Sequence, residues 1–98
     1  MKLLTGAIVD LFTKTGSQEK IQDPIVIARF FNPTGAGTWL ATEYDPEERT
    51  FFGWARITDG EWGYFPLEEL ESYKGPLGLG IERDINFTPC PFSKARML

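Results

Sequence analysis

The sequence has no histidine and a single cysteine, Cys90. Without histidine the chain lacks the most common general base near neutral pH and the most common metal ligand. Zinc sites built from cysteine and histidine are therefore excluded, and so are nucleophiles activated by a histidine. One cysteine cannot form a disulfide within the chain, so nothing indicates an oxidising compartment.

Long apolar runs are absent as well. The apolar stretch at the N-terminus is interrupted by Asp10, is too short for the core of a signal peptide, and is followed by no small-residue cleavage site. No segment approaches the roughly 18 apolar residues that a membrane span needs. We therefore expect a cytoplasmic protein that does not enter a membrane.

The chain has 98 residues, with 42% hydrophobic and 24% charged residues, which is typical of one soluble globular domain. We therefore expect a single domain over residues 1–98. Aromatic residues make up 14% of the chain, and they concentrate between Phe51 and Phe65. Large aromatic side chains let a small domain consolidate its core.

The net charge is −4, but the acidic residues concentrate in the middle of the chain. Residues 31–71 hold nine acidic and two basic side chains, a net charge of −7, whereas residues 1–30 and 72–98 are slightly basic. An acidic protein is disfavoured for non-specific nucleic-acid binding, because Lys and Arg contacts to phosphate supply most of that affinity.

The order of elements predicts an α+β fold. We expect an N-terminal helix over residues 3–14, with Thr5 as its N-cap and a buried stripe of Ala7, Ile8, Leu11 and Phe12. A mainly antiparallel sheet of four to five strands follows, with strands over residues 25–31, 38–44, 50–57 and 61–65.

Two local signals complete the fold prediction. Asp59-Gly60 indicates a type I′ hairpin turn. Pro66 then fits the start of a short helix whose Leu67 and Leu70 face the core. A last strand over residues 81–87 and an extended tail end the chain.

Nine residues form the candidate binding surface. Carboxylates surround one turn and begin the short helix, and Trp62 supplies an aromatic group. The set comprises Glu43, Asp45, Glu47, Glu48, Glu61, Trp62, Glu68, Glu69 and Glu71. Such acids could attract a basic partner, or they could simply be solvated charges, those of the short helix favouring its dipole. Pro46 lies where a calcium loop would need to bend, so we expect no metal at this turn. We expect no cofactor of another kind either.

Four charged residues are candidates for structural ion pairs. Arg29 and Arg83 occupy otherwise apolar strand faces, and Glu82 and Asp84 share the face opposite Arg83. Buried arginines usually have a carboxylate partner, so we favour ion pairing over catalysis for this group.

The aromatic residues allow a second interpretation. Trp39, Trp54, Trp62 and Tyr64 could stack on bases, although this needs basic residues beside them. We expect most of them to pack in the core, with one or two exposed at a partner surface. The glycine-rich stretch 75–80 follows a helix and leads into a strand, which is the wrong order for a phosphate loop.

Several ordered motifs together resemble a known family. DPIVIARFFNP, TWLATEYDPE, FFGW, GYFPLEELE and GPLGLGIERD are similar to a small bacterial family, domain of unknown function 2958, from residue 3 to about residue 91. The resemblance implies a gene carried largely on plasmids, conjugative elements and phage-like elements. It supplies no activity and no catalytic residue.

The leading functional hypothesis is a non-enzymatic accessory protein of a mobile element that acts by protein–protein contact, for example by inhibiting a host defence enzyme. The sequence does not identify the protein partner, and it does not decide whether the chain forms a dimer. One alternative is a nucleic-acid-binding module using Lys14, Lys20, Lys74, Lys94 and Arg96. Another is an enzyme that uses only carboxylates, such as Glu82 and Asp84.

Overall fold

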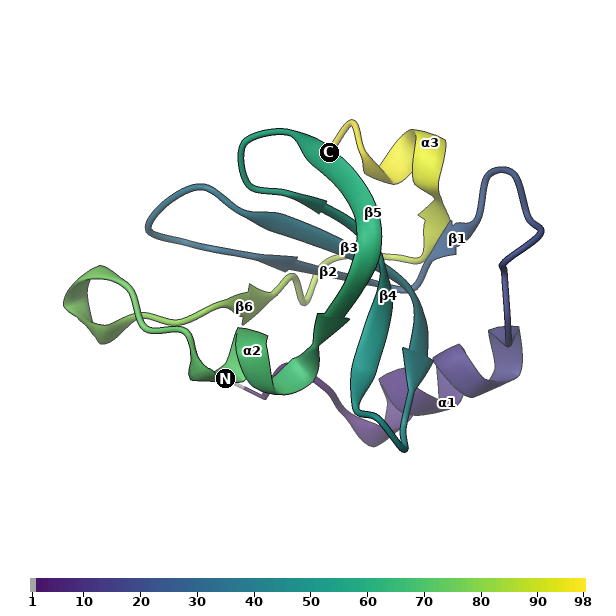
Figure 1. Cartoon of the computed structure of the whole chain (residues 1–98), viewed down its shortest axis with the longest axis horizontal. Coiled ribbons are helices and arrows are strands. Elements are labelled where there is room, and N and C mark those ends of the chain that lie inside the picture. The colour runs from purple at the N-terminus through teal and green to yellow at the C-terminus, as the bar shows by residue number, and fades with distance from the viewer. Residues whose placement is uncertain (1) are drawn as a thin grey trace.

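The computed structural model describes residues 2–98 and shows a strongly curved antiparallel sheet with short helices around it (Figure 1). The fold is α+β, as the sequence predicts. Its elements are α1 (Gly6–Thr15), β1 (Ile25–Val26), β2 (Ala28–Phe31), β3 (Thr38–Asp45), β4 (Thr50–Arg56), β5 (Gly60–Pro66), α2 (Leu67–Ser72), the 3-10 turn η1 (Pro76–Gly78), β6 (Glu82–Arg83), β7 (Cys90–Pro91) and α3 (Phe92–Ala95). No helix within residues 2–98 has the length and apolar character needed to cross a bilayer.

The main sheet has five strands in the order β5-β4-β3-β2-β6, and each neighbouring pair is antiparallel. The register between β3 and β4 shifts between Ala41 and Glu43, which marks a β-bulge. Bulges increase the local twist of a sheet. In Figure 1 the sheet bends accordingly, and β5 lies at the front of the view.

One side of the sheet, here called the helix face, packs against α1 and α2. Phe51 is fully buried at its centre and lies 5.2–5.8 Å, ring centre to ring centre, from Phe12, Phe30 and Phe65. Leu67 and Leu70 of α2 are buried there as predicted. This aromatic cluster fixes both helices against the sheet.

The N-terminal helix begins where the sequence predicts, because the Thr5 hydroxyl accepts a hydrogen bond from the backbone N–H of Ile8 at 3.3 Å. Its predicted buried stripe is wrong in part. Phe12 is buried and Ile8 packs against the core, but Ala7 and Leu11 are exposed. The helix therefore rests on the sheet along a narrower line than its apolar pattern indicates.

The opposite side, here called the tail face, is covered by the end of the chain. Val26, Leu40, Trp54 and Ala95 form a second buried cluster, with Phe92 packed against it. The predicted extended tail is wrong here, because residues 92–95 form α3 and Cys90 pairs with Val26 in a two-stranded sheet. The backbone N–H of Phe92 donates to the carbonyl of Pro24 at 2.8 Å, which fixes the start of α3 to the residue before β1.

Two further strand predictions are wrong in detail. The single strand predicted over residues 25–31 is two strands, because β1 pairs with β7 while β2 pairs with β3 and β6. Similarly, β6 contains only Glu82–Arg83 of the strand predicted over residues 81–87.

The predicted type I′ turn at Asp59-Gly60 is also wrong. Arg56 pairs with Gly60, so the turn consists of residues 57–59, and neither Asp59 nor Gly60 has a positive φ. Gly60 has a different role: a Cβ atom at this position would lie 2.1 Å from the indole ring of Trp54. The glycine therefore makes room for a tryptophan on the tail face.

Candidate functional site

Five aromatic side chains form a continuous row on the tail face, here called the aromatic row: Phe52, Trp54, Trp62, Tyr64 and Phe92. The ring of Phe52 lies 5.0 Å from that of Tyr64 and 6.1 Å from that of Trp62. The ring of Phe92 lies 4.6 Å from that of Trp62 and 5.3 Å from that of Trp54.

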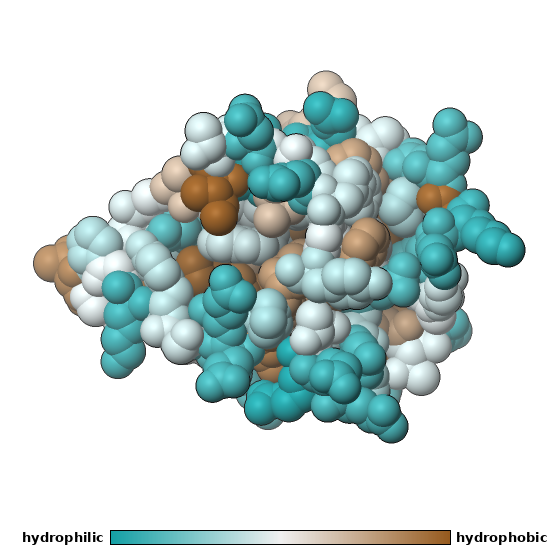
Figure 2. Space-filling model, viewed as in Figure 1, coloured by the Kyte–Doolittle hydropathy of each residue, from teal (hydrophilic) through white to brown (hydrophobic). Residues whose placement is uncertain are grey.

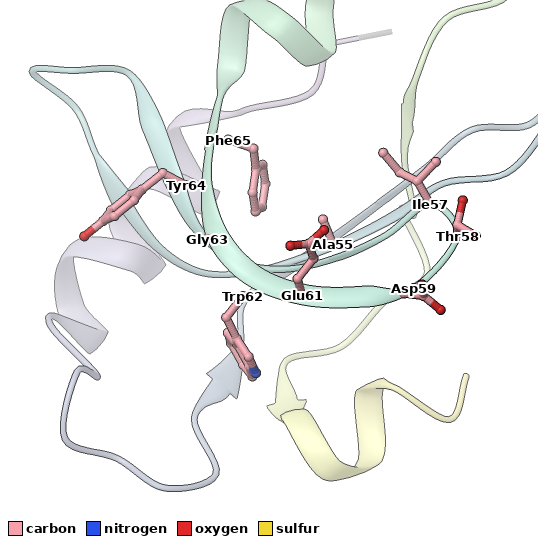
Figure 3. A pocket seen from close by; sticks show the side chains of 9 residues that line it. All are labelled: Ala55, Ile57, Thr58, Asp59, Glu61, Trp62, Gly63, Tyr64 and Phe65. Carbon is pink, nitrogen blue, oxygen red and sulfur yellow. The ribbon is translucent and has the colours of Figure 1, made fainter.

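The register of β4 and β5 explains how the row is built. Phe52 lies opposite Tyr64 and Trp54 lies opposite Trp62, so alternate residues of both strands place their side chains on one face. Figure 3 shows Trp62 and Glu61 on opposite sides of the β5 ribbon. The strand thus places Glu61 on the side away from Trp62.

Exposure divides the row into a buried and an accessible part. Trp54 is only 8% exposed, whereas Trp62 is 44% exposed and Tyr64 is 79% exposed. Exposed Trp and Tyr side chains are enriched among the residues that dominate protein–protein binding energies. Trp62 and Tyr64 are therefore the strongest candidates for contacting a partner.

Two shallow grooves border the exposed end of the aromatic row. One, of about 400 Å³, is lined by Glu43, Gln18 and Ile21 as well as Trp62 and Tyr64. The other, of about 430 Å³, continues past Tyr64 to the β3–β4 turn, and Glu48 and Asp45 line it. This end of the row therefore combines exposed aromatic rings with carboxylates.

A buried glutamine holds the groove in shape. Gln18 donates hydrogen bonds from Nε2 to the carbonyls of Ile25 and Thr42, both at 2.9 Å, and its Oε1 accepts from the N–H of Ile25 at 2.7 Å. Its backbone N–H also donates to the Glu43 carboxylate at 3.2 Å. These bonds fix the loop between α1 and β1 beside the bulge.

The other end of the aromatic row is basic. The guanidinium of Arg56 lies 5.5 Å from the Trp54 ring, and that of Arg96 lies 6.0 Å from the same ring and 5.7 Å from Phe92. Such distances are typical of cation–π contacts. The row thus runs from an acidic end at Tyr64 to a basic end at Trp54.

The sheet separates the predicted acidic residues. Glu43 and Glu48 line a groove beside Tyr64, whereas Glu61 lies on the helix-face side of β5, opposite Ala55. Glu47 is exposed in the β3–β4 turn. The acids of α2 form a separate group, and hydrophilic side chains follow the lower rim of the molecule around α2 and that turn (Figure 2). That group comprises Glu68, Glu69 and Glu71.

Two of these acids have structural contacts of their own. The Asp45 carboxylate accepts hydrogen bonds from the backbone N–H groups of Glu47 and Glu48, at 2.9 and 3.3 Å, and so shapes the turn. Glu71 lies 3.6 Å from the guanidinium of Arg49, but both side chains are well exposed. Exposed pairs of this kind contribute little to stability.

Of the four residues predicted as ion-pair candidates, Arg29 and Asp84 form a pair with their side chains 3.2 Å apart and partly exposed. Arg83 lies on the other side of its strand, opposite Phe30, and its guanidinium donates to the backbone carbonyl of Lys2. Glu82 lies opposite Phe31 in the register with β2.

The basic residues of the nucleic-acid alternative do not share one surface. Lys14 lies in the last turn of α1, Lys20 lies in the following loop, and Lys74 follows α2. Only Lys94 and Arg96 belong to the α3 region beside the aromatic row. Within residues 2–98, no cluster of three or more His, Cys, Asp or Glu side chains has a metal-binding arrangement.

Sequence reasoning missed three residues that shape this site: Phe52, Gln18 and Phe92. Phe52 alternates with the buried Phe51 along β4, so strand periodicity could have placed it on the face of Trp54. Nothing local marks Gln18 or Phe92, because their partners lie far away in the sequence.

No curated protein and no solved structure matches the chain significantly. The sequence profile of one family matches residues 3–94, which is nearly the whole chain. The chain therefore belongs to the family described as "Protein of unknown function (DUF2958)".

Proposed function

We propose that the protein is a non-enzymatic binding module that acts through protein–protein contact. Its docking surface is the acidic end of the aromatic row, formed by Trp62, Tyr64, Glu43 and Glu48. The supporting observation is Tyr64, a large aromatic residue that is 79% exposed and borders both acidic grooves. Aromatic rings beside carboxylates suit Lys and Arg side chains, which can stack on a ring and pair with a carboxylate.

The biological setting of the proposal follows from the family resemblance. Families carried by plasmids and phage-like elements meet host defence enzymes, and many such enzymes hold nucleic acid on a basic surface. We propose that this protein covers such a basic surface and thereby inhibits the enzyme. The carboxylates of Glu43, Asp45 and Glu48 beside Tyr64 support attraction of this surface to a basic site.

Titration of tryptophan fluorescence with an oligo-arginine peptide tests this proposal. We expect binding at low salt, because the peptide supplies the proposed guanidinium ligands, and a fall in affinity of about tenfold in Tyr64→Ser. The double variant Glu43→Gln/Glu48→Gln should weaken binding similarly. Its matched control, Glu68→Gln/Glu69→Gln, removes the same charge on α2 and should retain near-native affinity.

Two outcomes would contradict the proposed surface. Equal losses in the two double variants would show that net charge alone attracts the peptide. Native affinity in Tyr64→Ser would show that the aromatic row takes no part in binding.

The stacking of Arg56 and Arg96 on Trp54 supports a second candidate, in which single-stranded nucleic acid binds at the basic end of the row. Fluorescence anisotropy with a labelled oligothymidine tests it. This candidate predicts binding at low salt that is lost in Arg56→Gln/Arg96→Gln. Absence of binding at low salt, where phosphate contacts are strongest, would eliminate it.

A further inference from the structure

The β5 strand is an open edge of the main sheet. It has seven residues and, among residues 2–98, pairs on one side only, with β4. The opposite edge of the sheet is β6, which has only two residues. In Figure 1, β5 crosses the front of the molecule, and no strand lies along its outer side.

An open edge presents unpaired backbone N–H and C=O groups that can pair with another extended chain. Proteins usually protect such edges with bulges, prolines, charged side chains or a covering element, and here the charge of Glu61 opposes an acidic strand but not a basic one. The register between β4 and β5 contains no shift, and the only proline of the strand is its last residue, Pro66. The stretch from Gly60 to Phe65 is therefore suited to accept a further strand.

Carboxylates lie near this edge on both sides of the strand. On the tail face, Glu43 lines the groove beside Trp62 and Tyr64. A second hollow, of about 380 Å³, follows β5 itself and is lined by Glu61 as well as Trp62 and Tyr64; Glu61 projects from the side of the strand opposite Trp62, as Figure 3 shows from close by. A strand added next to β5 would point its side chains alternately toward the two sides.

We propose that an extended, basic segment of a protein partner adds to the sheet as a sixth strand along β5. Backbone pairing would hold the segment, and its Lys or Arg side chains would reach the carboxylates on both sides. This inference rests on the proposed function and specifies how the partner binds. A second copy of the chain fits less well, because it would bring the same acidic groups to the edge.

The test uses the acetylated and amidated peptide TKVKKVKT, which places lysines on both faces when it is extended. Two further peptides carry N-methyl groups, one on the even-numbered residues only and the other on every residue. Because successive amides of a strand point in opposite directions, the first keeps one edge of free amides that can face β5, whereas the second has none. Side-chain chemistry and charge are identical in the three peptides.

We expect the unmodified peptide and the alternately methylated peptide to bind, and the fully methylated peptide to bind at least about tenfold more weakly because it cannot donate backbone hydrogen bonds. Amide hydrogen exchange of the protein should then slow at alternate residues of β5. Equal affinities of the two methylated peptides, whether equal to or lower than that of the unmodified peptide, would overturn strand addition. If both bind as well as the unmodified peptide, the proposed side-chain docking remains intact.

Two further results would also overturn the inference. If none of the three peptides binds, strand addition of a basic segment fails, and retained oligo-arginine binding would show that the proposed function survives. If sedimentation shows a dimer of this chain that the peptide cannot dissociate and in which β5 amides are protected, the edge belongs to a second copy instead.

Discussion

Two glycines of β5, Gly60 and Gly63, differ in what a methyl group would meet. A Cβ at Gly60 would lie 2.1 Å from the Trp54 ring, whereas a Cβ at Gly63 would meet nothing within 4 Å. Trp54 is nearly buried and cannot move away freely. We therefore expect Gly60→Ala to lower the free energy of unfolding by about 2 kcal/mol, the usual cost of overpacking.

The Gly63→Ala variant is the matched control for this prediction. It should change the free energy of unfolding by less than about 0.5 kcal/mol, since it adds the same methyl group to the same strand in open space. Urea denaturation measures both variants. Similar losses in both would mean that strand flexibility, and not contact with Trp54, requires glycine at these positions.

The hydrogen bonds of Asp23 predict that the free energy of unfolding depends on pH. Hydrogen bonds from the Ser93 hydroxyl, at 2.6 Å, and from the Ser93 backbone N–H, at 2.9 Å, lower the pKa of Asp23 below its ordinary value of 3.8. The folded-state pKa is thus below the unfolded-state pKa. The resulting stabilisation is present above pH 3.8 and is lost as the pH falls through the lower, folded value.

Urea midpoints measured at about pH 6 and about pH 2.5 test this prediction. Asp23→Asn should destabilise the protein at the higher pH and reduce the difference between the two pH values. Asp10→Asn, at an exposed position of α1, should leave that difference unchanged. The prediction fails if Asp23→Asn and the native chain lose equal stability on acidification.

Among the elements, the loop between α1 and β1 depends on Gln18. Its side chain is nearly buried and satisfies backbone groups of Ile25 and Thr42. Gln18→Ala would leave these groups buried without partners, so we expect a loss of about 3 kcal/mol in the free energy of unfolding. Gln22→Ala, at an exposed position of the same loop, should be nearly neutral. A small effect of Gln18→Ala would show that water can replace its side chain.

The elements also show which parts of the fold could be predicted from the sequence. The Thr5 cap and the burial of Leu67 and Leu70 depend on neighbours within one turn, so local patterns identify them. The break of the predicted strand at Ile27 depends on β7, more than 60 residues later, which captures β1. No local pattern encodes that choice.

In the candidate site, too, some features follow from local sequence and others depend on distant parts of the chain. Alternation along β5 makes it possible to predict that Trp62 and Tyr64 share a face. The exposure of these two side chains could not be predicted, because it depends on how far α3 extends over the tail face. Likewise, the acids are close in sequence, but the sheet passes between Glu43 and Glu61 and places them on opposite sides.

For the whole molecule, the two buried clusters lie on opposite faces of one sheet and share its strands. We therefore expect the chain to unfold as one cooperative unit, although the tail-face cover comes from short elements. Phe92→Ala should lower the free energy of unfolding by about 2 kcal/mol, less than for a fully buried phenylalanine, because Phe92 is partly exposed.

Urea unfolding of Phe92→Ala, followed by both tryptophan fluorescence and far-ultraviolet circular dichroism, measures this cooperativity. The measurement is made in a Trp39→Phe background, because Trp39 packs against the helix-face cluster. The remaining Trp54 and Trp62 both contact Phe92, so fluorescence then reports on the tail face, whereas circular dichroism reports on the backbone as a whole. Coincident midpoints are expected, and Ile85→Ala, at an exposed position before β7, should match the native chain. If fluorescence changes at lower urea than circular dichroism does, α3 detaches while the sheet stays folded. Trp62 would then lose its contact with Phe92 while the core stays folded. Partner binding at the aromatic row would therefore be coupled to the packing of α3 on the tail face.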